Sequence, residues 1–514
     1  MNLDSIIQPF IELFPGDFSG NLMQRQTPKV LFATIPTEQF EQPELIHFNE
    51  NLSNEIGLGK LASEEEKDFL YAKNLPKNIK SYATAYAGHQ FGNWAGQLGD
   101  GRAILAGEIK NKDGQSTELQ WKGAGATPYS RHADGRAVLR SSVREYLMSE
   151  AIHHLGIPTT RALSLSYTGE DVVRDVMYNG NPAPEKGAVI VRTAPSFLRF
   201  GHFELLSAQK EIDTLKKLAD YTIEKYYLEI NPLSETRYKE FFHQICKRTA
   251  DMIVEWYRVG FVHGVMNTDN MSVLGLTIDY GPFSMMDEYD LRFTPNTTDL
   301  PGRRYAFGKQ AEIGQWNLWQ LANALHPLIN DSQFLEQELN GYGTYFWSKH
   351  DEMLAKKFGF DRLIGSDEEF FTSWQQMMQD LKLDYALFFI LLEKFDDNSD
   401  IKKHFEPCVY YQLSENDWDK LEVFLQNYHN RLKENTISNE ERLALMQKSN
   451  PKFILRNYLL YNCIEELEKG SMELFNKIWN ALQNPYESLY PEFEVKRPSK
   501  FDGTIGCSML SCSS

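Results

Sequence analysis

The stretch HGVMNTDNMSVLGLTIDYGPF, residues 263–283, holds the side chains on which the interpretation of this 514-residue chain depends. It places Asn270 and Asp279 nine residues apart, and both carry oxygen atoms of the kind that Mg²⁺ prefers. Two protein oxygens are enough for Mg²⁺, because the ion keeps several waters and takes further oxygens from phosphates. The stretch therefore predicts a metal site for phosphate chemistry, with an ordinary polar turn at NTDN as the alternative.

The spacing within this stretch matches the catalytic loop of protein kinases, H-R-D-x-x-x-x-N, followed by D-F-G. His263 lies seven residues before Asn270, and Asp279 begins a D-Y-G triplet. The position of the kinase base is occupied by Val265, which cannot accept a proton. Asp269 can replace that base if the acceptor group also moves. The stretch thus belongs either to an inactive kinase-like protein or to an enzyme for a different reaction.

Upstream residues follow the order that a nucleotide-phosphate site requires. The glycines of GQLGDGRAIL, residues 96–105, allow backbone amides to approach phosphates, and a strand lysine and a helix glutamate follow, as in the Lys–Glu pair of kinases. The predicted contacts are Gly99, Gly101, Arg102 and Lys122, with Glu145 as the ion-pair partner of Lys122, and Arg192 and Arg199 as additional phosphate contacts. Taken singly, each has an ordinary alternative: a ligand-free glycine turn, a surface lysine or solvent-facing arginines.

The predicted type of secondary structure changes near residue 200. Between 81 and about 195, short alternating or β-branched runs predict strands at 102–109, 117–123, 161–167 and 187–193, with one helix at 136–155. Beyond about 203 the spacing of apolar residues predicts helices, including 235–260 and a buried one at 385–392. The sequence therefore predicts a strand-rich first part and a helical second part.

Composition restricts the partners and the location of the protein. With 53 Lys and Arg against 71 Asp and Glu, the net charge of −18 disfavours binding to nucleic acid or to anionic membranes. The start of the chain lacks a basic, apolar signal segment, and the five cysteines are mostly far apart, which is typical of a reducing compartment. We expect a cytoplasmic protein in which any polyanionic ligand is bound by a local group of cations.

Several long motifs together resemble the selenoprotein O family, whose members are protein adenylyltransferases on a kinase-like fold. They are YAGHQFGNWAGQLGDGRAILAGEI, QWKGAGATPYSRHADGRAVLRSSVREYLMSEA, VRTAPSFLRFGHFE, the stretch at 263–283, and NPKFILRNYL. The resemblance extends from about residue 80 to 460. It implies an α+β, two-lobed protein-kinase-like fold with an N-terminal extension (1–80), a strand-rich N-lobe (81–200), a helical C-lobe with family-specific extensions (201–495) and a flexible cysteine-containing tail (496–514).

The resemblance also implies a reaction. ATP binds in an orientation flipped relative to kinases, AMP is transferred to a Ser, Thr or Tyr hydroxyl of a protein, and pyrophosphate leaves. Asp269 is then the proton acceptor, and Asn270 and Asp279 hold Mg²⁺, with Mn²⁺ as the alternative. The ATP contacts comprise Gly99, Gly101, Arg102, Lys122, Asp134, Gly135, Arg192, Arg199 and Asp279. The acceptors are expected among redox or metabolic proteins.

The tail GCSMLSCSS carries Cys507 and Cys512. Some members of the family have selenocysteine near this end, and bacterial members can pair a tail thiol with a cysteine in the loop after D-Y-G. In this chain that loop, 284–307, has no cysteine. A bridge between Cys507 and Cys512, a mixed disulfide with a target and two reduced thiols all remain open. The other three cysteines are expected in the core.

Two functions compete with adenylyl transfer. The missing base at Val265 favours a catalytically silent, ATP-binding pseudokinase scaffold, whereas the retained Asp269, Asn270 and Asp279 disfavour it. A kinase that moves the γ-phosphate uses the same groups, so spacing alone does not exclude it.

Overall fold

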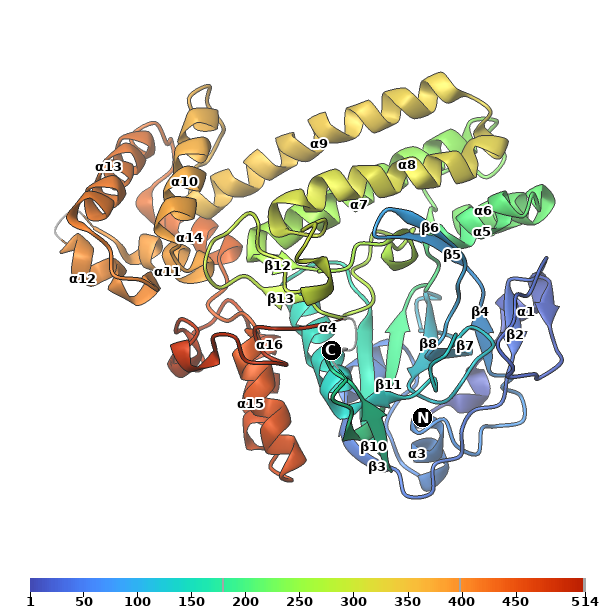
Figure 1. Cartoon of the computed structure of the whole chain (residues 1–514). Helices are drawn as coiled ribbons and strands as arrows, with labels where there is room; N and C mark the ends of the chain where they lie inside the picture. Colours follow the sequence, from blue (N-terminus) through green and yellow to red (C-terminus); the bar gives the residue numbers. More distant parts are fainter. Residues whose placement is uncertain (178–179, 397–398, 512–514) are drawn as a thin grey trace.

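A large mixed sheet organises the first 200 residues (Figure 1). The structure, a computed structural model, describes residues 1–177, 180–396 and 399–511. Within them the sheet has nine strands in the order β1-β2-β4-β7-β8-β11-β10-β3, with β9 paired to β11. The pairs are antiparallel except β1 with β2. Its strands are β1 (Gly16–Asp17), β2 (Phe32–Thr34), β3 (Glu44–Phe48), β4 (Tyr82–Thr84), β7 (Ala103–Lys110), β8 (Ser116–Lys122), β9 (Ala137–Val138), β10 (Arg161–Arg174) and β11 (Ala183–Ala194).

The sheet is buried on both faces. Along β11, Ile190 belongs to a core shared with the helices, whereas its neighbours Val189 and Val191 belong to a second core on the opposite face. This separation follows from the period-2 alternation of side chains along a strand. Helix α4 (Leu139–His154) covers the first face, and the second core includes side chains from α2 (Glu50–Glu55) and α3 (Glu64–Leu70). The sheet is therefore a rigid base for the residues at its ends.

The first 80 residues, expected as an extension, are part of this sheet. They supply β1 and β2 at one edge and β3 at the other, and a short helix, α1 (Pro9–Leu13), packs beside them. Gly16 lies directly against the ring of Phe32, where a side chain would have no space. The apolar residues of this segment are too scattered for its strands to be predicted from periodicity.

Helices make up most of the second part of the chain, as the sequence predicts. Helices α7, α8 and α9 pack against one another and lie side by side in Figure 1. The helices after α4 are α5 (Phe200–Ala208), α6 (Ile212–Tyr226), α7 (Arg237–Val259), α8 (Gln310–Ile329), α9 (Ser332–Phe358), α10 (Asp367–Leu381), α11 (Tyr385–Lys394), α12 (Ile401–Phe405), α13 (Glu415–Leu432), α14 (Asn439–Ser449), α15 (Asn457–Glu468) and α16 (Glu473–Gln483). No helix in the described ranges is long and apolar enough to cross a membrane.

The last helices return to the sheet. Helices α15 and α16 pack on α4, and Trp479 of α16 lies 5.6 Å from the ring of Tyr146 and 4.4 Å from that of His47 (centroid to centroid). Phe475, which is fully buried, completes this aromatic group. The N-terminal and C-terminal parts are thus joined by one continuous core.

The sequence predicted a flexible tail from residue 496, but residues 496–511 are packed against the loop that follows the D-Y-G triplet. Arg497 forms ion pairs with Asp287 at 3.0 Å and Glu288 at 2.9 Å, and the carbonyl of Leu510 accepts a hydrogen bond from the amide of Thr297 at 2.8 Å. These contacts join residues about 200 positions apart, so no local sequence pattern predicts them.

The described cysteines are buried free thiols, namely Cys246, Cys408, Cys463 and Cys507. The prediction of core packing for the first three is confirmed. Burial raises the pKa of Cys507 to about 12, so this thiol is protonated and a poor nucleophile in the docked tail. Cys512, the other predicted redox residue, lies outside the described residues.

The other predicted elements are observed with ends shifted by a few residues, except that β10 continues seven residues beyond its predicted run at 161–167. Strands β7, β8, β10 and β11 cover the four predicted runs, and α4 covers most of 136–155. Helix α7 ends at Gly260, whose φ of 78° is the left-handed conformation that often terminates a helix. The coarse α+β prediction is confirmed.

Candidate active site

The stretch 263–283 forms a closed loop at the end of α7. Strands β12 (Phe261–Val262) and β13 (Ser284–Met285) pair antiparallel on either side of it, and the amide of Met286 donates to the carbonyl of Gly260 at 2.7 Å. Within the loop, His263 Nε2 lies 2.8 Å from the carbonyl oxygen of Ile278. The loop is thereby held at both ends and across its middle.

Asp279 lies between two buried arginines. Arg192 Nη1 donates to its Oδ1 at 2.9 Å, and Arg199 Nη1 donates to its Oδ2. Burial alone would raise the pKa of Asp279, but Arg199, Arg192 and Lys122 hold it well below its usual range. Asp279 adopts a φ of 57°, which is uncommon for a residue with a side chain. A charged carboxylate is therefore fixed in a strained backbone position beside two cations.

Lys122 and Glu145 form the predicted ion pair, and Glu145 also accepts from Arg192 Nη1 at 2.8 Å. Burial lowers the pKa of Lys122, while the nearby glutamate opposes that shift. Glu145 keeps its charge because Lys122 and Arg192 outweigh the effect of burial and lower its pKa. Lys122, Glu145, Arg192, Asp279 and Arg199 thus form one chain of alternating charges, which we call the charge cluster.

The carboxylate of Asp269 is buried and only partly satisfied. Its Oδ2 accepts a hydrogen bond from Gln90 Nε2 at 3.1 Å, whereas Oδ1 has no hydrogen-bond partner among the residues described. Burial raises the pKa of Asp269 to about 6, with Gln90 and Arg199 opposing the shift. Its backbone carbonyl accepts from Arg199 Nη1 at 2.7 Å, which ties it to the charge cluster. A carboxylate with one free oxygen and a pKa near neutrality is suited to accept a proton.

Asn270 is oriented by the residue that replaces the kinase base. Its side-chain Nδ2 donates to the carbonyl of Val265 at 2.9 Å, which leaves Oδ1 as the free acceptor of this amide. In the parts of the chain that are described, no group of three or more His, Cys, Asp or Glu residues could hold a metal ion. The donor set at the loop is one carboxylate and one amide, which fits a cation bound together with phosphates rather than a protein-only metal site.

The predicted glycine loop lies next to the charge cluster. A Cβ on Gly99 would come within 2.5 Å of the Tyr129 ring, and one on Gly101 within 2.9 Å of the Tyr129 carbonyl oxygen. Between them, the buried Asp100 accepts from the amide of Thr84 at 3.0 Å. These glycines therefore allow the loop to pack closely on its neighbours.

Arg102 follows the glycine loop at the start of β7, whose Ala103 pairs with Lys122. Its charge contributes to the lowered pKa of Lys122. The structure thus brings Arg102 to the edge of the charge cluster.

Asp134 and Gly135 are not part of the charge cluster. The carboxylate of Asp134 pairs with Arg174 at 2.7 Å, and Asp134 lines a separate pocket of about 650 Å³ together with Gly125. Gly135 packs against Gly125, where a Cβ would come within 2.1 Å of the carbonyl oxygen. One of its lining residues, Gly125, is three positions after Lys122 in the sequence.

A hairpin that the sequence patterns did not predict covers the 263–283 loop. Strands β5 (Ala87–Gln90) and β6 (Asn93–Gln97) reach toward α5 and α8 in Figure 1. The amide of His89 donates to Thr268 Oγ1 at 2.7 Å, and a Cβ on Gly88 would lie 2.8 Å from Asp269 Oδ1. In the sequence, HQF (residues 89–91) is visible only as part of a longer motif. The glycines on both sides of it, Gly88 and Gly92, were the available signal for a close approach of backbone.

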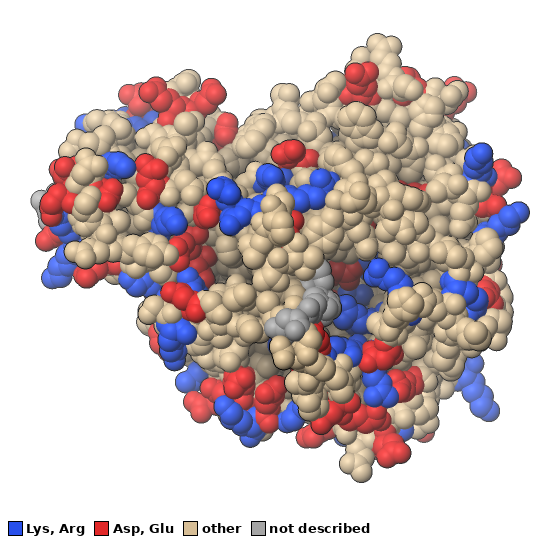
Figure 2. All heavy atoms as spheres, in the orientation of Figure 1, with Lys and Arg blue, Asp and Glu red and all other residues tan. Residues whose placement is uncertain are grey.

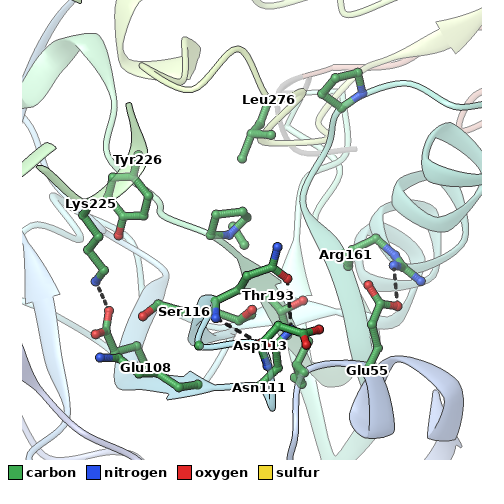
Figure 3. A pocket seen from close by; sticks show the side chains of 18 of the residues that line it. Glu55, Glu108, Asn111, Asp113, Ser116, Arg161, Thr193, Lys225, Tyr226 and Leu276 are labelled. Atoms are coloured by element: carbon green, nitrogen blue, oxygen red, sulfur yellow. Dashed lines mark hydrogen bonds and ion pairs between the residues drawn. The ribbon is translucent and has the colours of Figure 1, made fainter. Parts of the chain in front are cut away.

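A different pocket, of about 930 Å³, contains none of the predicted site residues (Figure 3). It lies between the turn joining β7 to β8, the end of α6 and the segment after β11. Two of its cations are already paired: Lys225 binds Glu108, and Arg161 Nε binds Glu150 at 2.7 Å. The charge cluster, rather than this pocket, has the chemistry for a phosphorylated ligand.

Positive charge is concentrated locally on a chain that is acidic overall. Figure 2 shows Lys and Arg side chains gathered at a hollow to the right of the centre of this face. Together, the cations around Asp279 and the half-satisfied Asp269 define a class: transferases that act on a phosphate-containing substrate.

Comparison with known proteins narrows this class. The family model described as protein adenylyltransferase SelO matches residues 20–483. Proteins described as protein nucleotidyltransferase YdiU are 49% identical in Cytophaga hutchinsonii, over 99% of this chain and 98% of the relative, and 44% identical in Flavobacterium johnsoniae, over 98% of each. A further one, in an Azoarcus species, is 42% identical over 98% of each. The chain belongs to the SelO family of protein adenylyltransferases, and the resemblance seen in its motifs is confirmed.

Proposed function

We propose that the protein transfers AMP from ATP to Ser, Thr or Tyr hydroxyls of other proteins and releases pyrophosphate. The single observation that carries this is the arrangement around Asp269: a buried carboxylate with a free oxygen lies next to a charge cluster, while the kinase base position is Val265. A base displaced by four residues fits an attack on a different phosphorus atom. The nucleotide therefore binds in the orientation flipped relative to kinases, with its α-phosphate toward the acceptor.

Each side chain of the site has a proposed part. Lys122, Arg192 and Arg199 bind the phosphates and stabilise the charge that develops on them. Glu145 holds Lys122 and Arg192 in place. Asp269 Oδ1 accepts the proton of the attacking hydroxyl. The remaining proposed ATP contacts are Gly99, Gly101 and Arg102 from the glycine loop, with Asp134, which lines a separate pocket, and its neighbour Gly135.

Asn270 and Asp279 would hold Mg²⁺, with Mn²⁺ as the alternative, because their oxygens are the hard donors that these ions prefer. When bound with the nucleotide, the ion would neutralise phosphate charge. We also propose a kinase-like two-lobed organisation, with the cleft between the sheet of residues 81–200 and the helices that follow. A cytoplasmic location is proposed from the cysteine usage and is in keeping with the free thiols described.

A second candidate is transfer of the γ-phosphate, since the same cations and the same base could serve it. A coupled assay for the released product separates the two. Adenylyl transfer predicts that pyrophosphate forms in step with acceptor modification, and that Asp269→Asn lowers the rate by about 10²–10⁴-fold, as expected for loss of a general base. Release of ADP without pyrophosphate would show that the γ-phosphate moves instead.

A further inference from the structure

Arg304 carries a guanidinium group that forms no ion pair with a carboxylate of the described residues. Its Nε and Nη2 atoms are buried without a hydrogen-bond partner among the described residues. The arginines of the charge cluster, Arg192 and Arg199, both bind Asp279. Buried guanidinium nitrogens without a partner are costly, so their retention at Arg304 indicates a use for them.

Two aromatic rings and a backbone hydrogen bond hold Arg304 in place. The guanidinium carbon lies 4.5 Å from the ring centroid of Trp316 and 5.8 Å from that of Tyr305. The backbone amide of Arg304 donates to Asp299 Oδ1 at 2.9 Å. Stacking on aromatic rings fixes the plane of a guanidinium while its edge remains available for an anion.

The position of Arg304 follows from three consecutive residues of the β5–β6 hairpin. Gln90 binds Asp269, the amide of Phe91 donates to Tyr305 at 3.0 Å, and a Cβ on Gly92 would lie 3.3 Å from Arg304 Cζ. Successive Cα atoms are about 3.8 Å apart. Gly92, which lies beside Arg304, is therefore only two residues from Gln90, the partner of the proposed base. This separation is within reach of a residue that neighbours the acceptor hydroxyl.

Arg304 lies away from the cations assigned to the nucleotide. None of its contacts within the described ranges involves Lys122, Arg192, Arg199 or Asp279. The surface around it instead carries exposed aromatic rings. Trp94 on β6 is 47% exposed, and its ring lies 5.0 Å from that of His89, which in turn lies 5.5 Å from Trp316.

We propose that Arg304 binds a carboxylate of the acceptor protein, from an Asp or Glu close in sequence to the modified hydroxyl. This inference rests on the proposed function and adds a preference among acceptors. The long-range field of a chain with net charge −18 repels acidic partners. The preference therefore depends on short-range pairing, in which the guanidinium donates to the carboxylate at close contact.

The test uses pools of Ser, Thr and Tyr peptides whose flanking positions are fixed as Asp and Glu, as Asn and Gln, or as Lys. Wild-type protein should label the acidic pool with the lowest KM. Arg304→Gln should raise that KM about tenfold or more, the value of a hydrogen bond to a charged group, and leave the KM for ATP unchanged. Arg304→Glu should shift the preference to the Lys pool.

Arg303→Gln is the matched control, because it removes the same charge one residue away. The guanidinium of Arg303 donates to the carbonyl of Arg292 at 2.7 Å. It should leave the peptide preference unchanged. A raised KM for ATP in Arg304→Gln would overturn the proposal and make this residue a phosphate contact. Equal losses on acidic and neutral pools, or no preference in the wild type, would overturn it as well. Failure of the wild type to transfer AMP to any peptide or protein would instead refute the proposed function.

Discussion

The residues of the charge cluster are bound to one another. The sequence motifs assign Asp279 to the binding of the metal ion and of ATP. In the structure Asp279 is the shared partner of two buried arginines, Arg192 and Arg199. A change at this residue therefore acts on stability and on activity together.

Asp279→Ala should lower the free energy of unfolding by about 3–5 kcal/mol, because removing one partner of a buried ion pair leaves the other uncompensated. Asp279→Asn keeps an oxygen acceptor and should be less destabilised, while both variants lose AMP transfer. Denaturant unfolding of the two variants beside the wild type measures this. An Ala variant as stable as the wild type would show that the arginines find other partners.

The pH dependence of kcat/KM should follow Asp269. This carboxylate must be deprotonated to accept a proton, so the rate should fall as the pH drops below about 6, rather than near 4 as for an ordinary aspartate. Gln90→Leu removes a hydrogen bond that favours the charged form, so it should move the acid limb to higher pH. Because terminal phosphates also titrate near pH 6, the response to Gln90→Leu decides the assignment. If Gln90→Leu leaves the acid limb of the pH profile unmoved, that limb does not report the titration of Asp269.

At the scale of elements, the β5–β6 hairpin sets the distance between the glycine-rich segment and the catalytic loop. Gly88→Ala would place a Cβ 2.8 Å from Asp269 Oδ1 and 2.9 Å from its Cβ, so one of the two must move. We expect kcat to fall at least tenfold, since small displacements of catalytic groups are costly. Binding of ATP should be retained, as measured by calorimetry.

Gly341→Ala in α9 is the control for this change, because a Cβ there meets no atom within 4 Å. Its kcat should equal that of the wild type. A Gly88→Ala variant with wild-type kcat would mean that the hairpin does not hold the loop at a fixed distance.

Local sequence patterns predicted the elements whose buried side chains repeat with a single regular period. Strands β7, β8, β10 and β11 were visible as short alternating or β-branched runs, and α7 as an amphipathic repeat ending in glycine. Part of the charge cluster could also be predicted from the sequence, since Lys122, Glu145 and Asp279 lie in motifs with known spacing. By contrast, Gln90, Arg304 and the docked tail act through contacts between residues far apart in sequence, and polar residues in turns leave no periodic signal.

At the scale of the whole molecule, the two parts depend on each other. Helix α16 covers α4, and its Phe475 is buried against Tyr146 of α4 and His47 of β3. Phe475→Ala should therefore destabilise the entire protein by about 3–5 kcal/mol, the usual cost of truncating a buried phenylalanine.

The matched comparison is Val423→Ala on α13, which is 56% exposed and should change stability by less than about 0.5 kcal/mol. Thermal unfolding followed by circular dichroism and by tryptophan fluorescence measures both variants. If Phe475→Ala melted only a local C-terminal unit and left the main transition unmoved, the two parts would be separate folding units.

The central claim is that the site moves the α-phosphate of ATP with AMP attached, and the most direct test is incorporation of label. Purified protein, Mg²⁺ and an acceptor mixture are incubated with ATP labelled at either the α- or the γ-phosphate, with Asp269→Asn as the impaired control. The account predicts label on protein from the α-position alone, with a rate about 10²–10⁴-fold lower in the control. Label from the γ-position alone would contradict it and assign the site to phosphoryl transfer.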